Sequence, residues 1–355
     1  MPRPTLLTLR HWPPLGQWLL LIVLAGGLGQ LLKYFAVPAA LFIGPMLVAI
    51  GFGASGASIR LNRHLFRLGQ GCVGLIVAHS MSMAVLLSVL QSWPVMLFST
   101  VLTVLLSAVV GLGMVRYGGF PASTAAWGTA PGAASAMVSM AEDYGADSRI
   151  VATMQYVRVV CVVMIGALVS SVLGVGDAPA HLLAPSTPAI DLGQFGLSVV
   201  TIVIGVLLGS RIPAGALLLP LLLGGILQVS GLVEITLPDW LLAIAYACLG
   251  CYIGLRFDRA TIAYVWRRLP VMIGASLILI VLCAASAWLI AWLLSKDYLS
   301  VYLATSPGGL DSMAIIALDT HADVGLVLAM QTLRLFGVIV TGAFFARQII
   351  RLSER

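Results

Sequence analysis

Long apolar segments alternate with short polar ones along the whole chain. A helix needs about 20 apolar residues to cross a bilayer, and ten runs of roughly that length can be drawn. Their interiors are rich in Leu, Val and Ala and lack the every-second-residue alternation of barrel strands. The pattern predicts an all-α polytopic membrane protein with about ten transmembrane helices, at 16–35, 37–54, 66–90, 94–115, 150–173, 194–210, 213–231, 239–255, 270–294 and 324–346.

The composition agrees with this prediction. Apolar residues make up 60% of the chain and charged residues 9%, and the mean hydropathy is +1.07. Soluble domains carry about one quarter charged residues, so a water-soluble fold is excluded. The first run follows Arg3 and Arg10, as a signal peptide would, but no Ala-x-Ala cleavage site follows it. We therefore expect it to remain as a span.

The chain contains an internal duplication at an offset of 176 residues. Chance similarity between apolar segments would match leucines, but it would not align Pro-Gly pairs, Asp pairs and intramembrane Arg at one offset. We therefore divide the chain into repeat 1 (1–173), a polar linker (174–191) and repeat 2 (192–355). The matched blocks are Trp93-Pro94-Val95-Met96 with Leu269-Pro270-Val271-Met272, Thr129-Ala130-Pro131-Gly132 with Thr305-Ser306-Pro307-Gly308, Asp143 and Asp147 with Asp319 and Asp323, and Met154-Gln155-x-x-Arg158 with Met330-Gln331-x-x-Arg334.

The distribution of Lys and Arg predicts the orientation of the two repeats. Suppose that both termini are cytoplasmic, that each repeat crosses five times, and that 121–148 and 299–322 are re-entrant. Fourteen arginines then lie inside, whereas Lys33 and Lys296 lie outside, as the positive-inside rule requires. Six crossings per repeat would place the four arginines of 256–268 outside. Five is an odd number, so the 5+5 repeats are predicted to be inverted, an architecture that recurs in secondary transporters.

Each repeat has one segment too rich in Gly, Pro and hydroxyl residues for a lipid-facing helix. Non-helical backbone at membrane depth survives where protein or a water-filled cavity satisfies it, and its free N–H groups suit anions. The alternative is a tight turn with small residues for packing. The candidate substrate-binding residues in these two tips are Thr129, Pro131, Gly132 and Ser135 in the first, and Thr305, Ser306, Pro307, Gly308, Gly309 and Ser312 in the second.

Arg158 and Arg334 stand at equivalent positions inside otherwise apolar helices. A charge at membrane depth is costly and marks a functional site, so both arginines are candidates for binding an anionic substrate. The alternative is a buried ion pair with one of the nearby carboxylates. If they line a wet cavity, Arg158→Ala or Arg334→Ala should abolish binding and leave the amount of membrane protein within about twofold. Gln155 and Gln331, one turn earlier, either donate to the ligand or bond between helices.

Carboxylates near these segments have two predicted roles. Asp143, Asp147, Asp319 and Asp323 are expected near helix starts, where they would cap free N–H groups. Asp311 lies in the second tip where the first has Ser135, so it breaks the symmetry. We expect Asp311 to bind the coupling proton or sodium ion; the alternative is a helix cap.

Metal, cofactor and nucleic-acid sites find no support in the sequence. The five cysteines fall in apolar runs, Cys248 and Cys251 lack a second ligand pair, and His79 and His321 lack a matching His. We expect no metal, no cofactor and no nucleic-acid partner. The expected partners are the lipid bilayer, a small anion, a coupling proton or sodium ion and, in a homodimer, a second copy of the chain.

The duplicated blocks resemble those of the bacterial AbrB membrane-protein family over essentially the whole chain. They are Trp-Gly-x-x-Pro-Gly-Ala-Ala-x-Ala-Met from Trp127 and Thr-x-Pro-Gly-Gly-Leu-x-x-Met from Thr305, each followed by Ala-Asp and Met-Gln-x-x-Arg. One departure is His321, which stands where the first copy has Gly145. The resemblance implies a duplicated membrane domain of the bacterial inner membrane.

Members of this family are also labelled ammonia monooxygenases or AbrB-type regulators. An oxygenase would need a metal or flavin site, and a DNA-binding regulator a soluble basic domain, and the sequence shows neither. We therefore expect no enzyme activity. The hypothesis that we favour is a secondary transporter of a small anionic metabolite, and the alternative is a membrane sensor that uses the same pocket. A membrane monooxygenase is the least favoured of the three.

Overall fold

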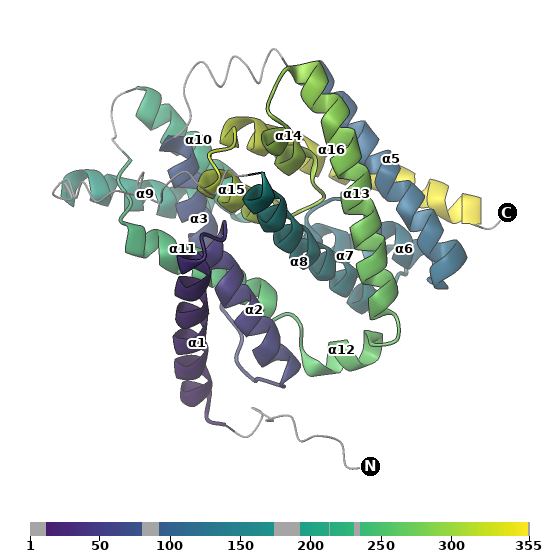
Figure 1. The fold of residues 1–355 in the computed structure, drawn as a ribbon, viewed down its shortest axis with the longest axis horizontal. Helices are drawn as coiled ribbons and strands as arrows, with labels where there is room; N and C mark the ends of the chain where they lie inside the picture. The colour runs from purple at the N-terminus through teal and green to yellow at the C-terminus, as the bar shows by residue number, and fades with distance from the viewer. Residues whose placement is uncertain (1–11, 80–91, 174–191, 213, 231–234, 354–355) are drawn as a thin grey trace. The chain divides into compact units, whose positions relative to one another are not determined.

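The computed structural model describes residues 12–79, 92–173, 192–212, 214–230 and 235–353. These residues form helices and turns, and no strand occurs among them (Figure 1). The predicted linker 174–191 and the second part of the predicted run 66–90 fall outside the described residues. The elements of repeat 1 are α1 (Pro14–Tyr34), α2 (Ala40–Ala54), α3 (Arg63–His79), α5 (Trp93–Gly118), α6 (Ala122–Thr129), α7 (Ala134–Asp143) and α8 (Ser148–Val172).

Repeat 2 continues with a corresponding series. Its elements are α9 (Leu192–Leu208), the 3-10 turn η4 (Gly209–Arg211), α10 (Gly215–Val229), α11 (Asp239–Gly254), α12 (Arg259–Val265), α13 (Leu269–Leu294), α14 (Tyr298–Thr305), α15 (Leu310–Asp319) and α16 (Val324–Ser353). Helices α13, α14 and α15 begin and end 176 residues after α5, α6 and α7, and α16 begins 176 residues after α8. The secondary structure thus repeats at the offset that the sequence predicts.

Five helices are long and apolar enough to cross a membrane: α1, α5, α8, α13 and the segment Gly193–Arg211. A sixth is reached if α11 and α12, bent by 48°, count as one span. The prediction of ten spans is not confirmed. The runs 37–54, 213–231 and 239–255 form α2, α10 and α11, which have only 15, 15 and 16 residues and fall short of a full crossing by length.

The chain divides into two units that do not follow the repeats. Unit 1 consists of residues 1–80 and 170–264, and unit 2 of residues 81–169 and 265–355. Each unit therefore combines the corresponding helices of both repeats. In unit 1, α2 packs against α1 and α11, and α3 packs against α9, α10 and α11; in unit 2, α5 packs against α6, α13 and α16, and α14 packs against α13 and α16.

Several local features recur in both repeats of unit 1. Left-handed Ala39 and Ala214 precede α2 and α10, and each of these helices contains a proline, Pro45 or Pro220. A proline inside a helix removes a hydrogen bond and bends the helix. Both helices are apolar throughout, so their composition does not show that they are only 15 residues long.

The position where the second repeat has His321 in place of glycine lies in the turn before the last helix of that repeat, and Gly145 occupies the same turn in the first repeat. Gly145 has φ +69° and its counterpart His321 has φ +53°. Both therefore occupy the left-handed region, which glycine enters without steric cost and histidine with some strain. The backbone is kept although the residue differs.

Glycines on α11 allow a close approach of α2 in unit 1. A Cβ added at Gly254 would lie 2.6 Å from Ala49 Cβ, and one at Gly250 would lie 3.1 Å from the Met46 nitrogen and still closer to the Phe42 carbonyl. Gly250 and Gly254 are four residues apart, the spacing that brings helix backbones together in membranes. Here small residues decide the packing distance.

We expect Gly250→Ala to destabilise the purified protein by about 1–3 kcal/mol, because the added methyl group overpacks against the α2 backbone. The measurement is the thermal unfolding temperature in detergent. Gly225→Ala in α10 is the matched control, since nothing lies within 4 Å of its added Cβ. Equal unfolding temperatures for both variants would show that this glycine does not set the α2–α11 distance.

Candidate functional site

Two short helix pairs in unit 2 are interrupted at equivalent positions. The first break, residues 130–133, separates α6 from α7, and the second break, residues 306–309, separates α14 from α15. Ala130 and Ser306 have φ −55° and ψ 126° and 136°. Each precedes a proline, and proline disfavours the helical region for the residue before it. The Ala-Pro and Ser-Pro pairs therefore end α6 and α14.

At each break, a glutamine side chain from the following long helix donates hydrogen bonds to the backbone carbonyls that the interruption leaves free. The Gln155 Nε2 atom donates to the carbonyl oxygens of Trp127 at 2.9 Å and Ala130 at 3.1 Å. Gln331 Nε2 donates to those of Leu303 at 2.9 Å and Ser306 at 3.1 Å. These carbonyls lie at helix C-termini, where the helix itself supplies no donor. Of the two predicted roles, the structure shows the interhelical hydrogen bond.

Arg158 completes the first break from α8. Its Nη1 donates to the carbonyls of Thr129 at 3.2 Å and Ala130 at 2.8 Å, and its Nη2 donates to Gln155 Oε1 at 2.6 Å. The side chain is only 3% exposed. A cation at a helix C-terminus also complements the negative end of the helix dipole. The guanidinium group thus holds α6 in its interrupted form.

Arg334 does the same for the second break from α16. Its Nη1 donates to the Ser306 carbonyl, and its Nη2 donates to the Gly308 carbonyl at 3.0 Å and to Gln331 Oε1. It is 5% exposed. Both guanidinium groups therefore satisfy buried backbone, which gives a reason to expect that their removal costs stability as well as binding.

No hydrogen bond or ion pair described for Arg158 or Arg334 involves a carboxylate, so the alternative of a buried ion pair is not seen in this part of the chain. Asp147 instead caps α8, accepting from the backbone nitrogens of Arg149 at 3.1 Å and Ile150 at 3.2 Å. Asp323 caps α16, accepting from Leu326 N at 3.0 Å, and pairs with Lys296 Nζ at 2.9 Å.

The other two aspartates lie elsewhere than expected. Asp143 and Asp319 are the last residues of α7 and α15, so they stand at helix ends and not at helix starts. The Asp143 side chain lies outside the described residues, and Asp319 is exposed. The spacing to the next helix start misled the prediction, because a turn of four residues separates each aspartate from that helix.

The hydroxyl residues of the tips are mostly engaged in their own helices. Thr129 Oγ1 donates to the Ala125 carbonyl and Thr305 Oγ1 to the Val301 carbonyl, both at 2.9 Å. Ser312 Oγ donates to the Gly309 carbonyl at 3.0 Å. Pro131 and Pro307 are buried and break the helices, Asp311 is half-buried in the first turn of α15, and the Ser135 side chain lies outside the described residues.

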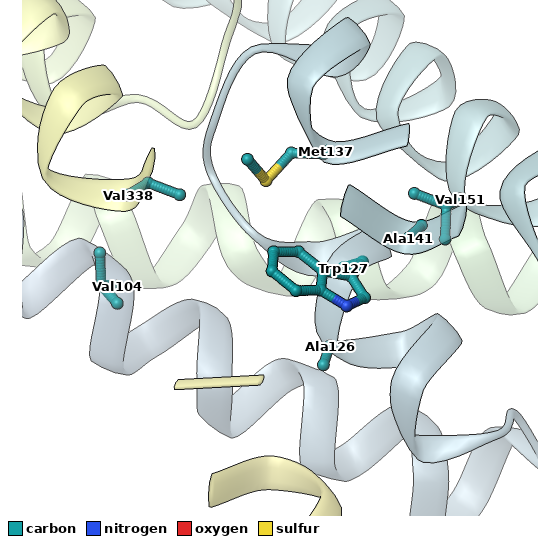
Figure 2. Close-up of a cluster of buried hydrophobic side chains, with 7 residues drawn as sticks. All are labelled: Val104, Ala126, Trp127, Met137, Ala141, Val151 and Val338. Atoms are coloured by element: carbon teal, nitrogen blue, oxygen red, sulfur yellow. The ribbon is translucent and has the colours of Figure 1, made fainter. Parts of the chain in front are cut away.

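Both breaks pack against the long helix of the other repeat. A Cβ added at Gly132 would lie 2.8 Å from Met137 and 3.2 Å from Val338 of α16, and one at Gly308 would lie 3.0 Å from Met313 and from Val162 of α8. Figure 2 shows Val338 beside Met137 in a cluster around Trp127. Each break therefore contacts the last helix of the opposite repeat, and its glycine leaves room for that contact.

Three further residues of this core were not among the predicted site residues. Ser107 of α5 donates to the Thr129 carbonyl at 2.9 Å, and its counterpart at the 176-residue offset is the buried Cys283. Trp127 fills the space beside the first break (Figure 2). The repeat offset was the available signal, since it pairs the polar Ser107 with Cys283 in otherwise apolar helices.

Buried polar atoms without a hydrogen-bond partner also gather here. Among the described side chains they include Arg158 Nε, Arg334 Nε and Ser306 Oγ. Both guanidinium groups are buried in unit 2. Concentrated positive charge with unused donors is an environment that favours an anion. No cluster of three or more His, Cys, Asp or Glu suited to a metal occurs in the part of the chain that the structure describes.

Comparison with known proteins finds one family over most of the chain. The family model described as "Transition state regulatory protein AbrB" matches residues 41–350. A protein of Escherichia coli (strain K12) named "Putative regulator AbrB" is 41% identical over 340 residues, which cover 95% of this chain and 97% of that protein. The "Uncharacterized protein YhjN" of Bacillus subtilis (strain 168) is 29% identical over 297 residues, covering 79% and 77%.

Proposed function

The chain belongs to the AbrB family, and we propose that this member is a secondary transporter of a small anion, with the two breaks of unit 2 as its binding site. The observation that carries the proposal is the pair of buried arginines at the breaks, Arg158 and Arg334, which have no carboxylate among their described partners. Interrupted helices at membrane depth, related by an internal repeat, are the recurrent binding element of secondary transporters.

The polar atoms at the breaks support binding of an anion. The Nη atoms of each arginine bond to backbone carbonyls, which position the guanidinium group, whereas each Nε–H is left without a partner. A buried donor without a partner costs free energy, which a ligand oxygen would recover. The arginines in this proposal are therefore both a support of the breaks and the source of positive charge.

Asp311 is the proposed coupling residue. It is a half-buried carboxylate in the first turn of α15, directly after the second break, where the first repeat has Ser135. A carboxylate at this depth favours a bound proton or sodium ion. Binding of the cation and of the anion at neighbouring positions would lower the charge that must cross the membrane, and no enzyme chemistry or cofactor enters the proposal.

The alternative function is that of a membrane sensor or regulatory protein, which the name of the Escherichia coli relative favours. Reconstituted flux separates the two. A transporter moves a labelled anion into proteoliposomes down an imposed proton or sodium gradient, whereas a sensor binds the anion and moves none.

We further propose that the repeats are inverted, in the inner membrane, with both termini cytoplasmic. The support is the excess of arginine on one side when each repeat crosses five times. A membrane-impermeant maleimide should therefore label Ser186→Cys and Ser353→Cys from opposite sides of the membrane in intact cells and inverted vesicles. Labelling of both from the same side would refute the odd number of crossings and the inversion together.

A further inference from the structure

A small cavity in unit 2 lies beside the first break. Residues of α5, α6, α8 and α13 line it, and it has room for about one water molecule. Arg158 and the break-flanking Gly128 and Thr129 line one side. The cavity therefore adjoins the arginine that supports the first break.

Arg158 is the one charged residue among the described residues that line this cavity. Its Nε has no partner, and its side chain is 3% exposed. The two lining hydroxyl groups, of Thr129 and Ser276, already donate to carbonyls four residues earlier in their own helices. The positive charge in the lining of the cavity thus comes from Arg158, whose Nε–H is also without a described partner.

The rest of the lining is largely apolar and adaptable. It includes Met114, Met154 and Met272 together with Val110 and Leu279. Methionine side chains are unbranched and can repack around ligands of different size. Ligand sites combine a mainly apolar lining with a few placed polar groups, and the lining of this cavity has that character.

We propose that this cavity binds a short-chain aliphatic monocarboxylate, with the carboxylate on Arg158 and the alkyl group among the three methionines. The inference rests on the proposed function, because it names the substrate class of that site. A carboxylate oxygen fills the one-water space against the guanidinium group, and movement of the methionines admits the alkyl group. No residue of the second break is among the residues that line this cavity.

The test is a thermal-unfolding titration of the purified full chain in detergent with sodium formate, acetate, propionate and butyrate at fixed ionic strength. A ligand that binds the folded state raises the unfolding temperature in a saturable manner. We expect binding to tighten by about fourfold for each added CH₂ group until the pocket is full. Chloride at the same ionic strength should give no such series.

Ser276→Val makes an uncharged position of the cavity lining bulkier and should weaken carboxylate binding by roughly tenfold or more. Thr100→Val is the matched control, because Thr100 is the counterpart of Ser276 at the 176-residue offset and makes the same bond, from its hydroxyl group to the Met96 carbonyl. Thr100→Val should leave binding unchanged. Arg158→Lys, which keeps the charge but loses the Nε–H and the planar fork, should weaken binding to a similar extent as Ser276→Val.

Three results would overturn the inference: carboxylate binding that Ser276→Val leaves intact, affinity that is equal for formate, butyrate and chloride, or no saturable effect of any acid. The titration measures binding in detergent and not transport, so its result can contradict the binding site without contradicting the transport proposal, and the reverse. Binding without flux would keep this site and remove the transporter, whereas gradient-driven flux of another anion with no carboxylate binding would do the reverse.

Discussion

Arg334→Ala should destabilise the protein by about 3–5 kcal/mol, enough to remove most of the folded protein from the membrane fraction. The substitution leaves the carbonyls of Ser306 and Gly308 and the Gln331 Oε1 atom without the donors that they have now. Each is in the core of unit 2, where an unsatisfied acceptor bears its full desolvation cost. Arg158→Ala should behave in the same way at the first break.

The measurement is the unfolding temperature and the yield of monodisperse protein after extraction in detergent. Arg334→Lys keeps the charge, but a lysine ammonium group lacks the planar guanidinium fork that reaches all three acceptors. We therefore expect an intermediate loss of stability. Arg267→Ala, at an exposed position before α13, is the control for removal of a positive charge and should have little effect. An unfolding temperature of Arg334→Ala equal to that of the wild type would contradict the role of Arg334 in supporting the second break.

Converting the second break into a continuous helix should abolish anion transport and preserve the fold. In the triple variant Pro307→Ala, Gly308→Ala, Gly309→Ala, the helix propensities favour a continuous helix by about 5 kcal/mol, since proline costs about 3 and glycine about 1 relative to alanine. The new Cβ at position 308 would crowd Met313 and Val162, so some of this gain is lost to repacking. We expect anion flux to fall to the background of protein-free vesicles.

The same variant provides an internal check. In a continuous helix the carbonyls of the former break find donors four residues later, so Arg334 is no longer needed there. Arg334→Leu should therefore cost less in the triple variant than in the wild type, and a double-mutant cycle measures the difference. Gly274→Ala in α13, where nothing lies within 4 Å of the added Cβ, is the control for a helical glycine replacement and should be silent. Normal flux in the triple variant would show that the break is a packing feature only.

The breaks were predictable from the sequence because their cause is local. A proline restricts the residue before it, and Ala130-Pro131 and Ser306-Pro307 therefore end a helix wherever they lie. The repeat offset was equally visible, and the structure reproduces it in the bounds of six helices of unit 2. Local rules and self-comparison were sufficient for these features.

The partners of Arg158 and Arg334 were not predictable in the same way. A sequence shows that a charge lies at membrane depth, and carboxylates are the partners that it offers nearby. The carbonyl oxygens freed by a break are equally good acceptors, but they become available only once the helix has been interrupted. The sequence also did not show which helices pack into the same unit, because each unit joins segments of both repeats that lie far apart in the chain.

Lengths of the shorter helices were overestimated because hydropathy does not report where a helix ends. The run 213–231 is apolar throughout, yet left-handed Ala214 delays the start of α10 to Gly215, and the run 194–210 ends in the 3-10 turn Gly209–Arg211. Such conformations are set by packing against neighbouring helices, as at Gly209, where an added Cβ would lie 2.9 Å from the Ala216 nitrogen. These contacts are not encoded in the local pattern of apolar residues.

The most direct test of the transport proposal is uptake of radiolabelled small carboxylates into proteoliposomes that contain the wild-type chain or the triple-alanine variant, with imposed proton or sodium gradients and protein-free vesicles as background. The account predicts saturable, gradient-driven uptake by the wild type of at least one carboxylate that also stabilises the detergent-solubilised protein, and background uptake by the variant. Binding of that carboxylate by a wild type that moves none of it, under either gradient, would contradict the transporter and leave a membrane sensor.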